Sequence, residues 1–383
     1  MHDRHIAARA VRVGNVAYLA LPGGGMALLH RESGRLSVYN RPARLLWRSL
    51  RAGDAACLPH ILVSRYGLPL EAAQRDVGAI LSQWIGQGLV IAGDDHGASP
   101  AVDAPARELA EIVPREATEL YRFSNLVVGL SAEASVLGRI APLLTHLRVA
   151  DAEPGLDCVI GSAGADRYFL TVDGRVAVED VEEHVVVGAF HQQIIEKLHP
   201  GARWRAFMHA AAVARDGAVA IFAAPSGSGK STLTASLVAR GYDYFSDDVV
   251  PLMAQGDAVA PFPLPSSVKP GAARVLARHY PTLDGEARGL QYLVHATPFS
   301  APPAAARALI FPRYVSGAPT RFEPLNVTDA MTRLLSDRVY LGYPLEAEAV
   351  RGFVDWLGRV GRHELVYSDV EEADACVSRA LKN

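Results

Sequence analysis

Cysteine is scarce in this chain of 383 residues. Its three cysteines, Cys57, Cys158 and Cys376, lie far apart, and none belongs to a Cys-x-x-Cys pair. This spacing disfavours a zinc site and a disulfide framework and favours a reducing compartment. The chain also lacks an uninterrupted apolar run near the ~20 residues of a membrane helix, and it opens without an apolar signal region. We therefore expect a cytoplasmic protein with no membrane partner.

An excess of charge of either sign is missing as well. The chain has 38 Lys and Arg against 41 Asp and Glu, a formal net charge of −3. Nothing in this balance suggests a nucleic-acid partner. Hydrophobic residues make up 50% of the chain, which is enough for sizeable cores. Because the length exceeds that of a typical single domain, we expect two or three domains.

The most informative stretch that is present is Ala224-Pro-Ser-Gly-Ser-Gly-Lys-Ser231. It follows an apolar strand pattern over 218–223 and precedes a helical pattern that Gly241 closes. Gly227 and Gly229 allow the chain to curl so that successive N–H groups point inward, and the start of the helix adds positive potential. The stretch therefore predicts a phosphate-binding loop and hence nucleotide binding.

Within this loop the pattern assigns individual roles. Lys230 would reach the β- and γ-phosphates of ATP, and the Ser231 hydroxyl would bind Mg²⁺. Ala224 stands where the loop pattern usually has glycine, so the backbone there must keep an ordinary φ angle. The expected nucleotide-binding residues are Ser226, Gly227, Ser228, Gly229, Lys230, Ser231 and Thr232.

A histidine precedes the loop. Residues 209–214 are typical of a strand, and Asp216-Gly217 predicts a tight hairpin to the strand that enters the loop. In that register Arg215 faces Ala218 and His209 faces Ala224, at the mouth of the loop. A hydrogen-bonded structural histidine is the alternative interpretation.

Two adjacent carboxylates, Asp247 and Asp248, end a short strand pattern after the loop helix. Neighbouring residues of an extended chain point to opposite sides, so the two should differ in role. One could accept the proton of an acceptor hydroxyl while the other binds Mg²⁺ or positions the base. A turn or a helix cap is the alternative.

The remaining patterns outline the domains. Short strands and turns up to Tyr39, followed by three helical patterns, form a unit over residues 1–95. Residues 96–105 are typical of a polar linker. The rest, 106–383, divides into a mixed N-terminal part, 106–205, and a nucleotide-binding core with C-terminal elements, 206–383. We interpret the acidic stretch that contains His184, His191 and His199 as a solvated helix face rather than a metal site.

Residues 207–252 resemble the HPr kinase/phosphorylase family in residue types and spacing. His209 lies fifteen positions before Ala224, and Asp247 lies seventeen after Lys230. The resemblance implies an α/β fold with a P-loop kinase domain of the HPr kinase/phosphoenolpyruvate carboxykinase type. It implies catalytic roles for Asp247 as acid/base, Asp248 in the metal and base network, His209 near the reacting phosphate and Lys230 on the phosphates.

A second motif extends this resemblance. Glu286-Ala-Arg-Gly-Leu290 is similar to the Glu-x-Arg-Gly-Leu signature of the family. The similarity implies that Glu286 completes a Mg²⁺ site with Ser231 and Asp248. Lys269, Arg288 and Arg313 are further candidates for a cation beside the transferring phosphoryl group, or else ordinary surface charges.

The N-terminal unit resembles the PqqD-like fold, a winged-helix-like α+β module that recognises leader peptides. The resemblance rests on Leu36-Ser-Val-Tyr-Asn40 leading into the helix of Trp47, and on the long helix that runs into Gly88. It implies that a precursor peptide binds along the strand from Leu36 to Tyr39 and the helix from Arg75 to Trp84, by strand addition. An interaction domain without a peptide ligand is the alternative.

Together these patterns predict an ATP- and Mg²⁺-dependent kinase that phosphorylates a Ser or Thr hydroxyl of a precursor peptide in a ribosomal peptide natural-product pathway. Two alternatives stay open. The acceptor could be a small hydroxyl metabolite or a carrier protein, or the chain could be a nucleotide-sensing module that transfers no phosphate. A homo-oligomer is possible in each case.

Overall fold

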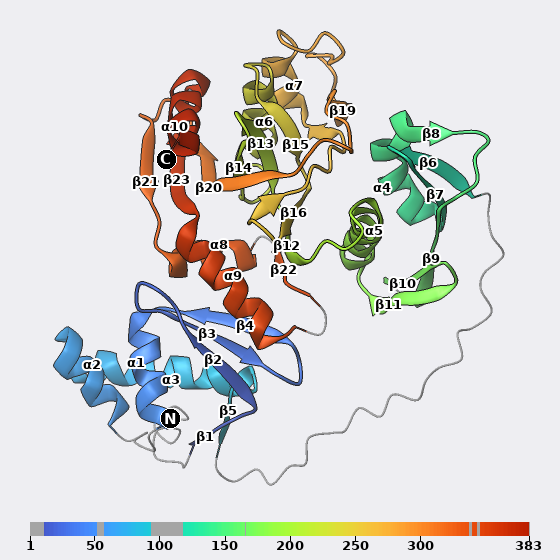
Figure 1. Cartoon of the computed structure of the whole chain (residues 1–383). Coiled ribbons are helices and arrows are strands. Elements are labelled where there is room, and N and C mark those ends of the chain that lie inside the picture. The colour runs from blue at the N-terminus through green and yellow to red at the C-terminus, as the bar shows by residue number, and fades with distance from the viewer. Residues whose placement is uncertain are drawn as a thin grey trace. The chain divides into compact units, whose positions relative to one another are not determined.

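The computed structural model describes residues 11–51, 57–92, 118–164, 166–336, 339–342 and 345–382 (Figure 1). The fold is mixed α/β with several sheets. One compact unit comprises residues 1–105, 325–336 and 341–359, and the other comprises 106–324, 337–340 and 360–383. The expected linker, 96–105, lies outside the described residues. No helix in the described part is both long and apolar enough to cross a bilayer.

The first unit opens with short strands followed by three helices, as the turn residues and the helical periodicity predict. Strands β2, β3 and β4 form an antiparallel sheet in that order, and β1 pairs with β5. Trp47 and Trp84 meet edge to face in the core beneath this sheet, with ring centroids 5.1 Å apart. The element bounds are β1 Val11–Val13, β2 Val16–Ala20, β3 Met26–His30, β4 Arg35–Tyr39, α1 Arg41–Arg51, α2 Leu58–Tyr66, α3 Leu70–Gly86 and β5 Val90–Ala92.

Two helices from late in the chain, α8 Val327–Ser336 and α9 Ala347–Arg359, belong to this first unit. We assigned them from the sequence to the region 106–383. Figure 1 shows both beside the N-terminal strands, and α8 contacts β4. Leu29 and Leu36 of the sheet line a small cavity together with Val350 of α9. The sheet is therefore covered on both faces, by α1 and α3 on one side and by α8 and α9 on the other.

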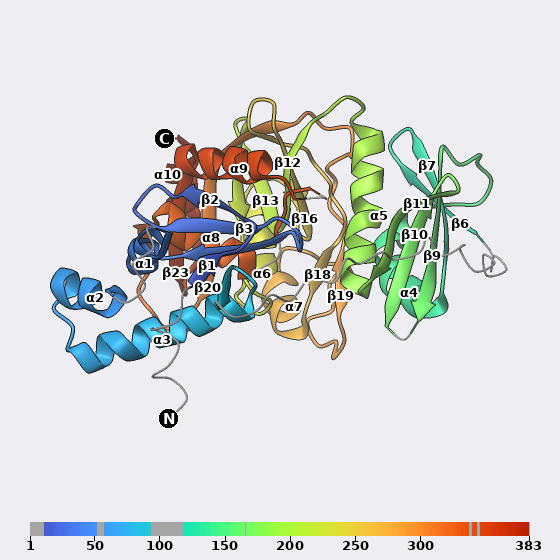
Figure 2. The same cartoon turned by 90° about the horizontal axis from the view of Figure 1, so that it is seen from below.

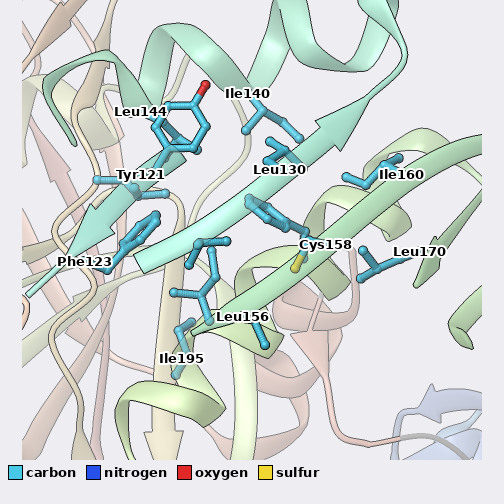
Figure 3. Packing of buried hydrophobic residues seen from close by; sticks show 14 of the residues in the cluster. Tyr121, Phe123, Leu130, Ile140, Leu144, Leu156, Cys158, Ile160, Leu170 and Ile195 are labelled. Atoms are coloured by element: carbon cyan, nitrogen blue, oxygen red, sulfur yellow. The ribbon is translucent and has the colours of Figure 1, made fainter. Parts of the chain in front are cut away.

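The second unit begins with a sheet of strand order β11-β10-β9-β7-β6-β8. Helix α5 packs on strands β9, β10 and β11, as Figure 2 shows. Apolar side chains from β6, β7, β9 and α5 fill the interior (Figure 3). The bounds are β6 Glu119–Phe123, β7 Leu126–Ala132, α4 Ala134–Leu144, a 3-10 turn Thr145–Leu147, β8 Arg148–Val149, β9 Leu156–Gly164, β10 Arg167–Val172, β11 Arg175–Val181 and α5 Glu183–Leu198.

A larger mixed sheet of the same unit follows the order β15-β13-β14-β20-β17-β16-β12-β22, with β23 and β21 continuing from β20. Strand β20 runs parallel to β14 and to β23, whereas the other pairings are antiparallel. The bounds are β12 Trp204–His209, β13 Ala211–Arg215, β14 Ala218–Phe222, β15 Asp243–Ser246, β16 Val249–Met253, β17 Ala258–Val259, β20 Ala304–Tyr314, β21 Arg321–Pro324, β22 Val339–Tyr340 and β23 Gly361–Tyr367.

Helices and a small hairpin surround this sheet. The apolar residues of α6 and α10 share a core with β13, β14 and β23, which fixes the start of α6 at the end of β14. The bounds are α6 Lys230–Val238, β18 Ser266–Val268, α7 Pro270–Leu276, β19 Gln291–Leu293 and α10 Val370–Lys382.

Candidate functional site

The glycine loop, residues 224–231, connects β14 to α6 as the sequence predicts. Gly227 and Gly229 have φ angles of 92° and 93°, in the left-handed region that glycine adopts without strain. Ala224 is not among the described residues with positive φ, which confirms the expected ordinary entry to the loop. The loop thus curls through its two glycines and delivers the chain into the first turn of α6.

Tight packing holds the second half of the glycine loop. A Cβ on Gly229 would lie 2.9 Å from the Tyr367 hydroxyl and 3.0 Å from Tyr314 Cβ, so only glycine fits there. The Tyr314 N–H donates to the Ser228 carbonyl oxygen over 2.9 Å, and the Tyr367 hydroxyl donates to the Gly229 carbonyl oxygen over 3.3 Å. Strands β20 and β23 therefore fix the loop from outside.

Two polar groups of the glycine loop stand out. The Ser228 hydroxyl is buried and has no hydrogen-bond partner among the described residues. Lys230, at the start of α6, is 7% exposed, and its ammonium lies 3.4 Å from His209 Nε2. A buried hydroxyl without a partner and a nearly buried ammonium both favour an anion at this place.

His209 comes to the site from a different strand than the one expected. The predicted strand over 209–214 is wrong, because His209 ends β12 and β13 begins only at Ala211. His209 is paired with Val249 of β16 and does not face Ala224. The hairpin itself is confirmed, with Arg215 opposite Ala218. The unbroken apolar run gives no signal of the break at Ala210, where the chain passes from one strand pair to another.

The imidazole of His209 lies between the Asp248 carboxylate and the Lys230 ammonium. Its Nδ1 lies 3.0 Å from Asp248 Oδ1, and its Nε2 faces the Lys230 ammonium. An ammonium can only donate, so Nε2 accepts and Nδ1–H donates to the Asp248 carboxylate. Burial would raise the pKa of Asp248, but the hydrogen bond from His209 and the electrostatic influence of His191, His209 and Lys230 lower it below its usual value. Asp248 is therefore an ionised anchor for His209.

Asp247 lies in the opposite environment. It is 8% exposed, and its Oδ1 is buried without a hydrogen-bond partner in the described structure. Burial raises its pKa to about 6, although hydrogen bonds from Ser231 and Ser266 and the charge of Lys230 oppose the rise. The two adjacent carboxylates thus differ in environment, and their pKa values shift in opposite directions.

Of the other candidate residues, Lys269 is hydrogen-bonded to the glycine loop, whereas Arg288, Arg313 and Glu286 are exposed. Lys269 Nζ donates to the Ser226 hydroxyl over 2.9 Å, so this lysine reaches the glycine loop. Arg288 and Arg313 are exposed, and in the described part of the chain no hydrogen bond or ion pair joins them to the site. Glu286 is also exposed, and its N–H donates to Asp284 Oδ1 in a local turn.

The described residues contain no group of three or more His, Cys, Asp or Glu side chains that could hold a metal ion. Glu286 is therefore not gathered with Asp247 and Asp248. The Ser231 hydroxyl lies within reach of the Asp247 carboxylate, and Asp248 is connected to Lys230 of the loop through His209. Few protein oxygens together with phosphate oxygens are the ligand set that Mg²⁺ accepts beside a nucleotide.

Sequence reasoning missed three side chains around these carboxylates. His191 of α5 is 1% exposed and close enough to Asp248 to lower its pKa, whereas we had placed it on a solvated face. Ser266, which helps to lower the pKa of Asp247, is buried and hydrogen-bonded to His295, which is buried as well. Only the apolar alternation around His191 could have indicated burial, and no motif marks Ser266 or His295.

Comparisons with known proteins add no family to this geometry. No protein-family model matches the chain, and no curated protein matches it either.

Proposed function

We propose that the chain is an ATP- and Mg²⁺-dependent kinase with a P-loop domain of the HPr kinase type and a PqqD-like N-terminal domain. The observation that supports this most directly is the partnerless Oδ1 of buried Asp247, which lies on a carboxylate within hydrogen-bonding reach of Ser231 of the glycine loop. A buried carboxylate oxygen without a donor is costly unless a ligand satisfies it. An acceptor hydroxyl is a ligand that would do so. The free cysteines and the proposed acceptor are consistent with a cytoplasmic enzyme.

In this proposal the glycine loop binds the phosphates through its backbone N–H groups, and Lys230 neutralises part of their charge. Bound Mg²⁺ and ATP supply the phosphoryl group and further charge neutralisation. Ser231 and Asp248 would hold the metal, with His209 fixing Asp248. Lys269, already at the Ser226 hydroxyl, supplies a second positive charge at the loop.

Asp247 is the proposed base. The acceptor oxygen forms a bond to phosphorus, the bond from phosphorus to the leaving ADP oxygen breaks, and the hydroxyl proton passes to Asp247. Burial raises the pKa of this carboxyl to about 6, close to neutrality, which suits a group that must accept a proton and later release it. Asp248, with its lowered pKa, cannot take this role as well.

A peptide acceptor is supported by the first unit. Within the described residues β4 pairs only with β3, so its other edge offers unpaired N–H and C=O groups. The Ser37 and Tyr39 hydroxyls both donate to Gln87 Oε1, over 3.4 Å and 2.6 Å, which joins β4 to the end of α3. An extended leader peptide could add to this edge and raise the local concentration of its own Ser or Thr residues.

The test is to incubate the full chain with ATP, Mg²⁺ and each short peptide encoded beside its gene, and to look for a mass gain of one phosphate. We expect phosphorylation of a Ser or Thr, with loss of the reaction when the N-terminal half of the peptide is removed. Phosphate on small hydroxyl metabolites but on no peptide would favour the metabolite or carrier kinase. ATP binding with no transfer to any acceptor would favour a nucleotide sensor.

A further inference from the structure

An exposed aromatic side chain lies beside the glycine loop. Tyr314, the last residue of β20, is 51% exposed, and Val315 after it is exposed as well. The Tyr314 N–H donates to the Ser228 carbonyl oxygen, and the Tyr314 Cβ lies 3.0 Å from where a Cβ on Gly229 would be. Tyr314 is therefore anchored to the loop through its backbone and its Cβ, while about half of its surface stays open to solvent.

Hydrogen bonds and ring packing restrict the movement of this residue. The buried Tyr367 ring of β23 meets the Tyr314 ring edge to face, with centroids 5.7 Å apart. The Val315 N–H donates to the Tyr367 carbonyl oxygen over 2.9 Å, and the Ala318 N–H closes a turn onto the Val315 carbonyl oxygen over 3.1 Å. Tyr314 and Val315 thus form a preformed apolar surface, to which a ligand can bind with little loss of conformational entropy.

The sheet topology places this surface on one side of the glycine loop and Asp247 on the other. Strands β15 and β14 both run antiparallel to β13, and β20 runs parallel to β14 and to β23. Figure 1 shows β23, β20 and β14 side by side. The carboxyl ends of β15, β14, β20 and β23 therefore lie at one edge of the sheet, where α/β folds bind their ligands. Along this edge, Asp247 follows β15, the glycine loop follows β14, and Tyr314 and Tyr367 end β20 and β23.

The geometry of phosphoryl transfer decides on which side the nucleoside lies. The attacking oxygen and the leaving ADP oxygen lie on opposite sides of the transferred phosphorus, roughly in line. In the proposed function the acceptor hydroxyl lies at Asp247, so the ADP part of the nucleotide lies toward β20 and β23. With the phosphates in the glycine loop, the base then reaches the exposed surface of Tyr314 and Val315.

We infer that Tyr314 and Val315 form a base-binding subsite: the purine base of the nucleotide stacks on the phenol ring of Tyr314 and packs against Val315. This inference rests on the proposed function, because it takes the glycine loop as the phosphate site and Asp247 as the acceptor side. Tyr314 contacts the base and not the phosphates. Its contribution can therefore be measured apart from that of the glycine loop.

The first experiment is calorimetry with Mg²⁺ and either ATP or tripolyphosphate, which has three linked phosphates and no nucleoside. Tyr314→Ala keeps the N–H and the Cβ that contact the glycine loop, so it removes only the ring. We expect this variant to weaken ATP binding roughly tenfold or more, and to leave the affinity for tripolyphosphate within about twofold of wild type. Tyr314→Phe keeps the ring and should bind ATP as wild type does.

Tyr66→Ala is the matched control, because Tyr66 of α2 is 41% exposed and belongs to the other unit. It should change neither affinity. An equal loss of ATP affinity in Tyr66→Ala and Tyr314→Ala would contradict a subsite at Tyr314.

The second experiment locates the base directly. 8-Azido-ATP carries its photoreactive group on the base; it is irradiated with the full chain, and the tryptic peptides are analysed by mass spectrometry. Trypsin cleaves after Arg313 and Arg321, so we expect a label on the peptide 314–321, and excess ATP should prevent it. A label that ATP prevents but that lies only on other peptides would overturn the inference.

The outcomes separate this inference from the proposed function. If Tyr314→Ala binds ATP as tightly as wild type, the base subsite is wrong while the kinase stands. If the variant loses affinity for ATP and for tripolyphosphate equally, Tyr314 supports the glycine loop and not the base. If the wild-type chain binds neither ATP nor tripolyphosphate, the proposed function fails and this inference fails with it.

Discussion

His209 Nδ1 lies 3.0 Å from Asp248 Oδ1, and the same ring presents Nε2 to the Lys230 ammonium at 3.4 Å. One imidazole thus links the acid after β15 to the lysine that begins α6. His209 ends β12 and Asp248 directly precedes β16, and these two strands pair in the large sheet. The imidazole connects the end of the glycine loop to Asp248.

The first prediction concerns this link. His209→Ala should lower phosphoryl transfer by roughly a hundredfold, because Asp248 loses its donor and Lys230 its neighbour. ATP affinity, measured by calorimetry, should change much less than kcat. His184→Gln is the control, since His184 is partly exposed and pairs with Glu182 away from the carboxylates. Equal losses in affinity and kcat would assign His209 to the nucleotide site alone.

The second prediction separates two reasons for glycine in the loop. Gly227 and Gly229 have nearly the same positive φ, but only Gly229 lacks room for a Cβ. Gly227→Ala should cost about 1–2 kcal/mol of local backbone strain. Gly229→Ala should cost more, because Tyr367 and Tyr314 must also move. ATP binding measured for both variants checks this, and an equal loss in the two would contradict the packing argument.

The third prediction uses the pH dependence of stability. His295 has a folded pKa of about 4, below its usual 6.5, so its contribution to stability is complete above pH 6.5 and is lost as the pH falls toward 4. That shift amounts to about 3 kcal/mol. Wild-type stability should therefore fall more steeply than that of H295Q between about pH 7 and about pH 4.5, as denaturant unfolding would measure. Parallel curves would show that His295 is not buried in its neutral form.

The fourth prediction tests the cover that α9 gives to the N-terminal sheet. Val350 is 2% exposed and faces Leu29 and Leu36 across a small cavity. Val350→Asp places an unpaired carboxylate there and should destabilise the first unit by about 3 kcal/mol or more. Gly358→Asp, at an exposed position of the same helix with open space around it, is the matched control. Hydrogen exchange of β2, β3 and β4 should rise in the first variant only.

The sequence predicted those parts of the site that depend on local signals. The glycine loop, its ordinary φ at Ala224 and the hairpin register of Arg215 with Ala218 all follow from turn and loop chemistry within a few residues. The site's adjacent carboxylates, Asp247 and Asp248, were also predicted to lie at a strand end, and they fall between β15 and β16.

Contacts distant in sequence could not be predicted in this way. His209 leaves the expected hairpin because the sheet, and not the local sequence, decides where β12 ends. Ser266 and His295 meet only because β18 pairs with β19. The helices α8 and α9 join the N-terminal sheet across more than half of the chain, and their own periodicity indicates a buried face without indicating its partner.

Asp247→Asn tests the central claim most directly. Asparagine keeps the shape of the side chain and cannot accept the hydroxyl proton, so ATP binding measured by calorimetry should stay within a few-fold of wild type while phosphoryl transfer falls by a factor of roughly a thousand. An Asp247→Asn chain that binds Mg²⁺ and ATP and transfers phosphate at the wild-type rate would contradict the account.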